Sequence, residues 1–345
     1  MKFVKWFAYL LVGAVALAFA YLLVMPPELL RVGTNYTAKM VCSNVVLANR
    51  NPDEVLAVDV QAPGHPLLRL MRLNISEFEG TTIVRAGLLG VIAEGAAAGN
   101  TSSGCTNMPA SMSDEQLFKA QMVPNRFAPA QTQLSADLQW PQGSAVDLED
   151  NEQLNAILND TQLVGPGMRA VVIVKDGRII AERYGEGFNA ETPLVGWSIT
   201  KTVTAALIGR AVREGHMTLD DPIESFDWSG DERGQVRFTD LMGMASNLEW
   251  NESYGSVSDV TRMLFLENDM AGFVAAQPID ADQPNAIGKV FNYSSGTTVL
   301  LSRIWQDAIG NEVDAVAFPT KALFEPLGMT SAVKEMDASG TYVGS

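Results

Sequence analysis

Histidine and cysteine are scarce in this chain, whose 345 residues include only two of each. His65 lies in a turn-like PGHP segment, and with one other histidine it cannot head a His-rich site, so we predict no metal and no cofactor. Basic residues are also few. The 24 Lys and Arg are outnumbered by 40 Asp and Glu, and no basic cluster interrupts the formal net charge of −16. This charge pattern argues against nucleic-acid binding.

Charge is missing altogether from residues 6–24, which two lysines precede and two prolines follow. A helix of this length spans about 28 Å, close to the thickness of a bilayer core. We predict that residues 1–27 are a single-pass inner-membrane anchor, with the lysines in the cytoplasm and the bulk of the chain in the periplasm. A cleaved signal peptide is the alternative, because Ala18-Phe19-Ala20 resembles a cleavage site.

The two cysteines, Cys42 and Cys105, both lie beyond this apolar segment. In an oxidising compartment an even pair predicts a disulfide, and the alternative is two buried free thiols. We expect residues 35–105 to form a small α+β region, closed by this bridge and separate from the later part of the chain. Residues 106–150 carry scattered prolines and are predicted to be a linker.

The main candidate for chemistry is the segment 195–215, VGWSITKTVTAALIGRAVREG. It places Ser198 and Lys201 three residues apart at the start of an apolar helical run, so both side chains share one helix face. A serine nucleophile needs an adjacent base, and the amine of Lys201 is placed to serve as one. The alternative is that Ser198 only caps the helix. A second Ser-x-x-Lys, at Ser331 and Lys334, has no apolar helix after it.

Two further segments surround this helix in the sequence. Two β-rich runs, 168–174 and 178–184, flank Asp176-Gly177 and predict a hairpin. Tyr293 precedes an apolar helix predicted at 297–304, in the sequence Tyr-Ser-Ser-Gly. Taken alone, Tyr293 reads equally well as a packed aromatic residue, and the serines after it as helix caps.

Together these pieces resemble the penicillin-recognising serine hydrolase superfamily, and most of all its class C β-lactamase-like members, which include esterases and 6-aminohexanoate-dimer hydrolases. The resemblance covers roughly residues 154–345. It is carried by the order of hairpin, Ser-x-x-Lys helix, LDDPI at 219–223 and Tyr-Ser-Ser-Gly, and by ALFEPLGMTSA at 322–332. It implies an α+β domain in which an antiparallel sheet is joined to a helical subdomain.

The resemblance also implies roles for individual residues. Ser198 would attack a carbonyl and form an acyl-enzyme, and Lys201 would accept or relay its proton. Tyr293 would act as partner base and then protonate the leaving group. Ser295 would contact substrate, where many members of the superfamily have asparagine. The chemistry is coherent, because two proton-sharing groups beside one serine can divide the acid and base work.

One motif of the superfamily is missing after Tyr293. In the superfamily, a strand that carries Lys or His, then Thr or Ser, then Gly normally flanks the site. No such triplet follows Tyr293 in this sequence. We therefore expect the domain at 151–345 to be truncated, the hairpin to keep an uncovered, partly apolar edge, and this chain to show little or no hydrolase activity.

These inferences predict an anchored, periplasm-facing serine hydrolase that cleaves small amide, ester or cyclic amide substrates. One alternative is a D-alanyl carboxypeptidase or penicillin-binding-like enzyme. A third possibility, of a different class, is a catalytically silent envelope protein that keeps the fold for binding. The predicted partners are a small-molecule substrate and the inner membrane.

Overall fold

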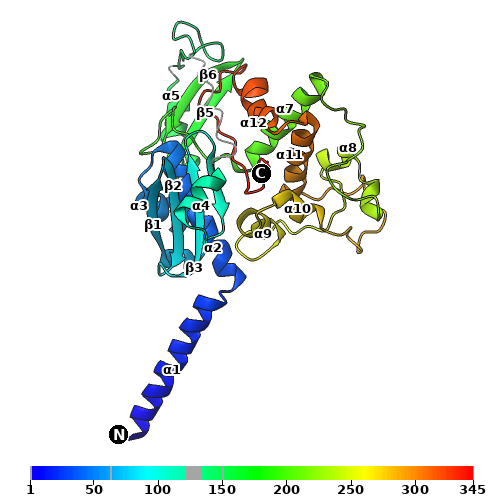
Figure 1. Ribbon diagram of the computed structural model, residues 1–345. Helices are drawn as coiled ribbons and strands as arrows, with labels where there is room; N and C mark the ends of the chain where they lie inside the picture. Colours follow the sequence, from blue (N-terminus) through cyan, green and yellow to red (C-terminus); the bar gives the residue numbers. More distant parts are fainter. Residues whose placement is uncertain (1, 63, 122–133, 150, 345) are drawn as a thin grey trace. The chain divides into compact units, whose positions relative to one another are not determined.

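The computed structural model describes residues 2–62, 64–121, 134–149 and 151–344 (Figure 1). Contacts between residues divide the chain into two compact units. Unit 1 comprises residues 1–127, 195–317 and 333–345, and unit 2 comprises residues 128–194 and 318–332. Residue 1 of the predicted anchor, and residues 122–133 and 150 of the predicted linker, lie outside the described residues. The predicted domain boundaries remain predictions.

Unit 1 begins with two helices, α1 (Lys2–Val24) and α2 (Glu28–Ala48). The prolines between them interrupt the helical hydrogen bonds, because proline has no N–H to donate. Within the described part of the chain, no single helix has both the length and the apolar composition of a membrane span. Of the described helical segments, only one pair meets both criteria when taken together: Tyr9–Val24 and Glu28–Ala48, which are bent by 60° at the break. The predicted anchor is therefore not confirmed.

Helix α2 packs on a four-stranded antiparallel sheet in the order β1-β2-β3-β4. The strands are β1 (Met71–Phe78), β2 (Thr81–Leu88), β3 (Ile92–Asn100) and β4 (Gly104–Met108). Strand β3 consists largely of alanine and glycine, which lets the helix approach closely. A Cβ at Gly95 would lie 2.6 Å from the backbone nitrogen of Asn35. Short elements precede the sheet: α3 (Pro52–Val55), a π-helical turn (Leu56–Gln61) and a 3-10 turn (Pro66–Leu70).

A disulfide joins Cys42 of α2 to Cys105 of β4, with the two Cα atoms 6.0 Å apart. Both cysteines are fully buried in the core between α2 and the sheet. Glu335 lies beside this bridge, where it accepts hydrogen bonds from the Cys105 N–H at 2.7 Å and the Ser43 hydroxyl at 2.8 Å, and pairs with Lys39. The disulfide region therefore contacts a segment far along the chain.

The stretch predicted as a linker begins with ordered structure. It contains the end of β4 and helix α4 (Asp114–Gln121). Leu117 of α4 is buried against Ile83 and Ala98 of the sheet, and Arg85 pairs with Asp114 at 2.9 Å. The prolines that suggested a linker lie outside this helix, and its apolar face is covered by the sheet.

The remainder of unit 1 is helical and is arranged around α11 (Ser295–Ile309), most of whose side chains are buried. Helix α11 contacts α7 (Thr200–Arg213), α8 (Phe238–Met242), α9 (Asp259–Leu266) and α10 (Met270–Ala275). Shorter 3-10 turns lie at Trp197–Ile199 and Glu232–Gln235. Helix α12 (Glu312–Phe318) follows α11 and ends at the boundary with unit 2, to which the next π-helical turn (Pro319–Phe324) belongs.

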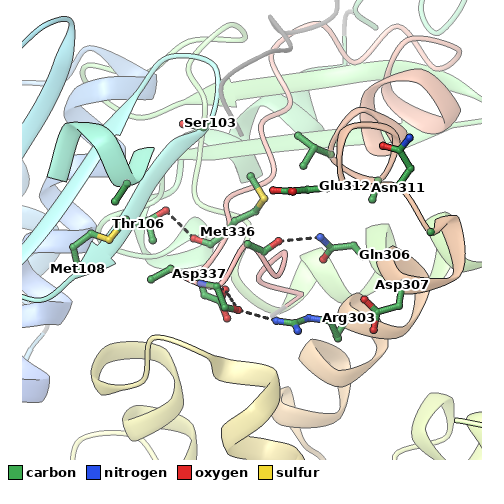
Figure 2. A pocket seen from close by; sticks show the side chains of 17 residues that line it. Ser103, Thr106, Met108, Arg303, Gln306, Asp307, Asn311, Glu312, Met336 and Asp337 are labelled. Carbon is green, nitrogen blue, oxygen red and sulfur yellow. Dashed lines mark hydrogen bonds between the residues drawn. The ribbon is translucent and has the colours of Figure 1, made fainter. Parts of the chain in front are cut away.

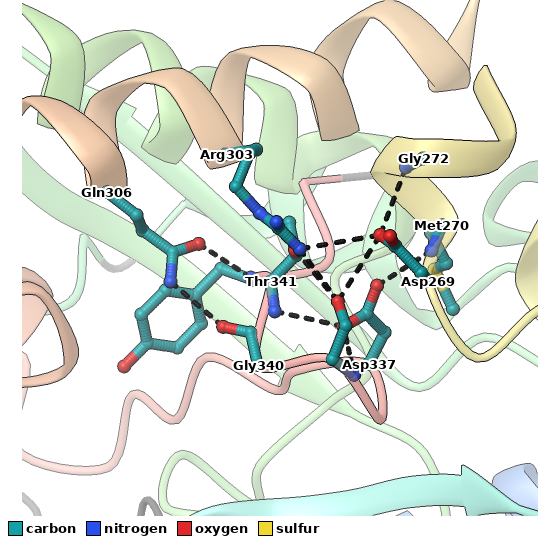
Figure 3. A network of polar contacts seen from close by, with 10 residues as sticks. Asp269, Met270, Gly272, Arg303, Gln306, Asp337, Gly340 and Thr341 are labelled. Carbon is teal, nitrogen blue, oxygen red and sulfur yellow. Dashed lines mark hydrogen bonds and ion pairs between the residues drawn. The ribbon is translucent and has the colours of Figure 1, made fainter. Parts of the chain in front are cut away.

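The segment 336–340 lines a cavity of about 430 Å³ together with β4 and the ends of α11 and α12 (Figure 2). Thr106 donates a hydrogen bond to the Met336 carbonyl at 2.9 Å. Asp337 accepts from the Met270 and Thr341 N–H groups, each at 2.9 Å, and Arg303 contacts Asp269 and Thr341 (Figure 3). Burial raises the pKa of Asp337, although these hydrogen bonds oppose the effect.

Unit 2 contains α5 (Glu152–Asn159), α6 (Thr161–Val164) and a hairpin of β5 (Ala170–Lys175) and β6 (Arg178–Tyr184). The hairpin turns at Asp176 and Gly177, which both have positive φ angles, as the Asp-Gly pair predicted. Among the described residues, no other strand pairs with β5 or β6. Val172 and Val174 of β5 are 46% and 49% exposed, so this two-stranded sheet has an apolar surface.

Candidate active site

Ser198 lies in the 3-10 turn Trp197–Ile199, which continues directly into α7. Trp197 has φ +43°, an unfavourable value for a bulky side chain, so the residue before Ser198 is strained. Further along α7, the side chains of Leu207, Ile208 and Ala211 are buried. The packed helix holds the exposed Ser198 at its N-terminal end, where the first N–H groups of a helix have no intrahelical acceptor.

The structure brings Ser198 together with the two residues predicted to act on its proton. The Lys201 amine donates to Ser198 Oγ at 3.0 Å, and the Tyr293 hydroxyl donates to the same oxygen at 2.9 Å. The Lys201 Nζ also lies 5.0 Å from the centre of the Tyr293 ring. The Lys201 amine and the Tyr293 hydroxyl thus both bond to the Ser198 oxygen, although Tyr293 follows Ser198 by 95 residues.

Tyr293 is held by the start of α11. Ser294 caps this helix by accepting a hydrogen bond from the Thr297 N–H at 3.1 Å. Gly296 follows in the first turn, where a Cβ would lie 2.9 Å from both the Trp250 ring and Val274. The glycine of Tyr-Ser-Ser-Gly therefore allows Trp250 to pack directly against the helix that carries Tyr293.

Ser295 is fully buried, and its hydroxyl is the second partner of the Lys201 amine, after that of Ser198. Its Oγ accepts a hydrogen bond from Lys201 Nζ at 3.1 Å and donates its proton to Glu252. The predicted contact of Ser295 with substrate stays a prediction.

Glu252 was not predicted from the sequence. Its carboxylate accepts from the Ser295 hydroxyl and from the Ser295 N–H at 2.9 Å. It also accepts from Trp250 Nε1 at 2.5 Å and from the Tyr254 hydroxyl at 3.1 Å. Partial burial and the nearby Glu252 charge raise the pKa of Tyr254 to about 12. The only sequence signal was the acidic, aromatic segment WNESY at 250–254.

The second Ser-x-x-Lys pair does not form a comparable site. Lys334 is buried, and its Nζ lies 3.2 Å from the Val343 carbonyl and 3.4 Å from the Thr204 hydroxyl of α7. Ser331 is exposed. Burial lowers the pKa of Lys334 to about 7. Across the described ranges, no group of three or more His, Cys, Asp or Glu side chains is placed to hold a metal ion.

Comparison with solved structures finds a protein assigned as a 6-aminohexanoate-dimer hydrolase from Bacillus anthracis. It is 18% identical over 51% of this chain and 49% of that chain, with a TM-score of 0.41. This chain therefore spans about half the length of that protein. A comparison with curated proteins found no match. Residues 160–337, just over half of the chain, match the Beta-lactamase family model. This match agrees with the order of motifs in the sequence, and the chain belongs to the Beta-lactamase family.

Proposed function

We propose that the chain is a serine hydrolase that cleaves small amide, ester or cyclic amide substrates through an acyl-enzyme. The observation that supports this most strongly is the convergence of Lys201 Nζ and Tyr293 OH on Ser198 Oγ, at 3.0 and 2.9 Å. A serine nucleophile needs an adjacent base, and either of these neighbours can share its proton. Family membership alone does not assign these roles.

In the proposed reaction, a deprotonated Lys201 takes the Ser198 proton, directly or through Tyr293, as the serine oxygen bonds to the substrate carbonyl carbon. The Ser198 N–H, at the start of the helical segment, stabilises the negative charge that forms on the carbonyl oxygen. Tyr293 then protonates the leaving amine or alcohol, and its own proton is replaced by the one that Lys201 took from Ser198. Water attacks the acyl-enzyme in the second half, with the same groups acting in the reverse sense.

Covalent labelling tests this proposal without requiring the natural substrate. We expect a fluorophosphonate probe to modify Ser198, and Ser198→Ala to abolish the label while leaving the chain folded. Ser331→Ala is the matched control, because this exposed serine also precedes a lysine by three residues. Equal labelling of the parent and Ser198→Ala would refute the assignment.

A fluorescent penicillin separates the alternatives. Labelling of Ser198 by fluorophosphonate alone supports the proposed hydrolase, whereas labelling by both probes favours a D-alanyl carboxypeptidase or penicillin-binding-like enzyme. If neither probe reacts, the chain is a silent binding protein, and the proposed activity is wrong.

We also propose that α1 anchors the chain in the inner membrane and that the remainder lies in the periplasm. Apolar side chains along α1 are exposed, including Tyr9, Leu10 and Leu17 at 70% or more. A buried disulfide between Cys42 and Cys105 fits an oxidising compartment. Carbonate extraction of membranes should leave the parent in the pellet and release a Leu10→Asp, Leu17→Asp variant. Release of both chains would contradict the anchor.

A further inference from the structure

Ser295 connects Lys201 to a carboxylate through a single hydroxyl group. A serine hydroxyl has one proton to donate and can accept from other donors. Here Ser295 Oγ lies between the Glu252 carboxylate and Lys201 Nζ, and the proton goes to Glu252. Lys201 must then direct one N–H toward Ser295, because the serine has no second proton to offer.

We propose that Glu252 is a positioning residue that, by accepting the Ser295 proton, keeps one N–H of Lys201 on Ser295 and leaves the amine's lone pair for Ser198. This inference rests on the proposed function, in which Lys201 acts as a base. If Ser295 instead donated its proton to Lys201, the lone pair would be occupied by Ser295. Lys201 would then be a poorer acceptor for the Ser198 proton.

The surroundings of Glu252 support this role, because its carboxylate accepts four hydrogen bonds from three residues. Two donors, the Ser295 N–H and Trp250 Nε1, have fixed protons and cannot accept in return. The other two, the hydroxyls of Ser295 and Tyr254, could turn either way. A carboxylate accepts at both oxygens and donates at neither, so it fixes the direction of both hydroxyls.

Glutamine at position 252 should reverse this direction with little change in shape. Its amide oxygen would have to face the two fixed N–H donors, because its NH₂ cannot accept from them. The NH₂ group would then face the Ser295 hydroxyl and donate to it. The Ser295 proton would be free to turn toward Lys201, so Glu252→Gln would occupy the lone pair while keeping the packing.

The test measures the rate at which a fluorophosphonate modifies Ser198, from about pH 6 to about pH 10. Glu252→Gln should lower the plateau rate by about tenfold or more. It should also move the pH midpoint downward, since loss of a nearby negative charge favours the uncharged amine. The titratable groups facing Lys201 are Tyr293 and, through Ser295, Glu252 and Tyr254. A structural defect alone would lower the plateau without moving the midpoint.

Two further variants make the result specific. Glu249→Gln is the matched control, because it removes an exposed carboxylate three residues earlier. Ser198 of this variant should be labelled at the parental rate. In a Ser295→Ala background, Glu252→Gln should cause no further loss of the plateau rate, since the hydroxyl through which it orients Lys201 is gone. A tenfold loss of the plateau rate for Glu252→Gln in that background would overturn the proposal, because Glu252 would then act on the rate by another route.

The outcomes distinguish this inference from the proposed function. A parent that is not labelled at Ser198 refutes the proposed function and this inference with it. A labelled parent with parental labelling in Glu252→Gln refutes the inference alone. If Glu252→Gln unfolds below the assay temperature, Ser295→Ala carries the test, with a loss of about tenfold expected. A parental rate in Ser295→Ala would overturn the proposal.

Discussion

Replacing the buried Lys334 with methionine should stabilise the chain most at neutral and acidic pH. Lys334 Nζ contacts only neutral groups in its hydrogen bonds, the Val343 carbonyl and the Thr204 hydroxyl. Burial lowers its pKa from the ordinary 10.5 to about 7. Methionine keeps the length and packing of the side chain and removes the charge.

The direction of the effect follows from proton binding. Between pH 7 and 10.5 the folded chain has released the Lys334 proton, whereas the unfolded chain still holds it. Stability therefore rises with pH across this window, by about 1.4 kcal/mol per pH unit. The full window corresponds to about 5 kcal/mol, which is the cost of burying the charge below pH 7. Lys334→Met should remove this slope.

Thermal unfolding at several pH values measures the slope. The useful range ends near pH 10, because burial also raises the pKa of Tyr342 and Tyr254, and these groups oppose the trend at higher pH. Lys289→Met is the control, since this lysine is exposed. If the Tm of the parent does not rise from pH 7 toward 9.5 relative to that of Lys334→Met, the account of Lys334 is wrong.

Three further changes test the site and its supports. Gly296→Ala should cost about 1–3 kcal/mol of stability, because a Cβ there meets the Trp250 ring at 2.9 Å; an unchanged Tm would show that Trp250 moves away freely. Tyr293→Phe should slow fluorophosphonate labelling of Ser198 by about 10²-fold with an unchanged Tm, whereas a parental rate would remove Tyr293 from the proposed chemistry. Replacing both Cys42 and Cys105 with serine opens a loop of 63 residues and should cost about 4 kcal/mol, measured as a lower Tm than that of the oxidised parent. Equal Tm values would mean that the core around the bridge is sufficient without it.

The elements of this fold were largely predictable where local pattern decides them. The strand predicted at 178–184 matches β6, and the helix predicted at 297–304 lies within α11. Asp176-Gly177 specifies its turn through backbone conformation alone. The spacing of Ser198 and Lys201 likewise gives their contact, because three residues on a helix nearly complete one turn.

The contacts that complete the site could not be read from local pattern. Tyr293 reaches Ser198 across 95 residues, and only the order of motifs suggested it. Glu252 has no such motif, and its partner Ser295 lies 43 residues away. Lys334 was set aside because no apolar helix follows it, yet the fold buries its amine against α7. In each case packing between distant segments decides the role of the side chain.

The segment 334–341 is held to distant parts of unit 1 by polar contacts. Glu335 pairs with Lys39 of α2 across 296 residues, and Asp337 accepts from the start of α10. Thr341 bonds to Arg303 of α11, while Lys334 reaches α7. One short segment therefore contacts the disulfide region and three helices that surround the candidate site. Its own sequence has no long apolar run, so its importance comes from buried polar contacts. Charged groups in such positions need partners to offset the cost of burial, and these partners tie unit 1 together.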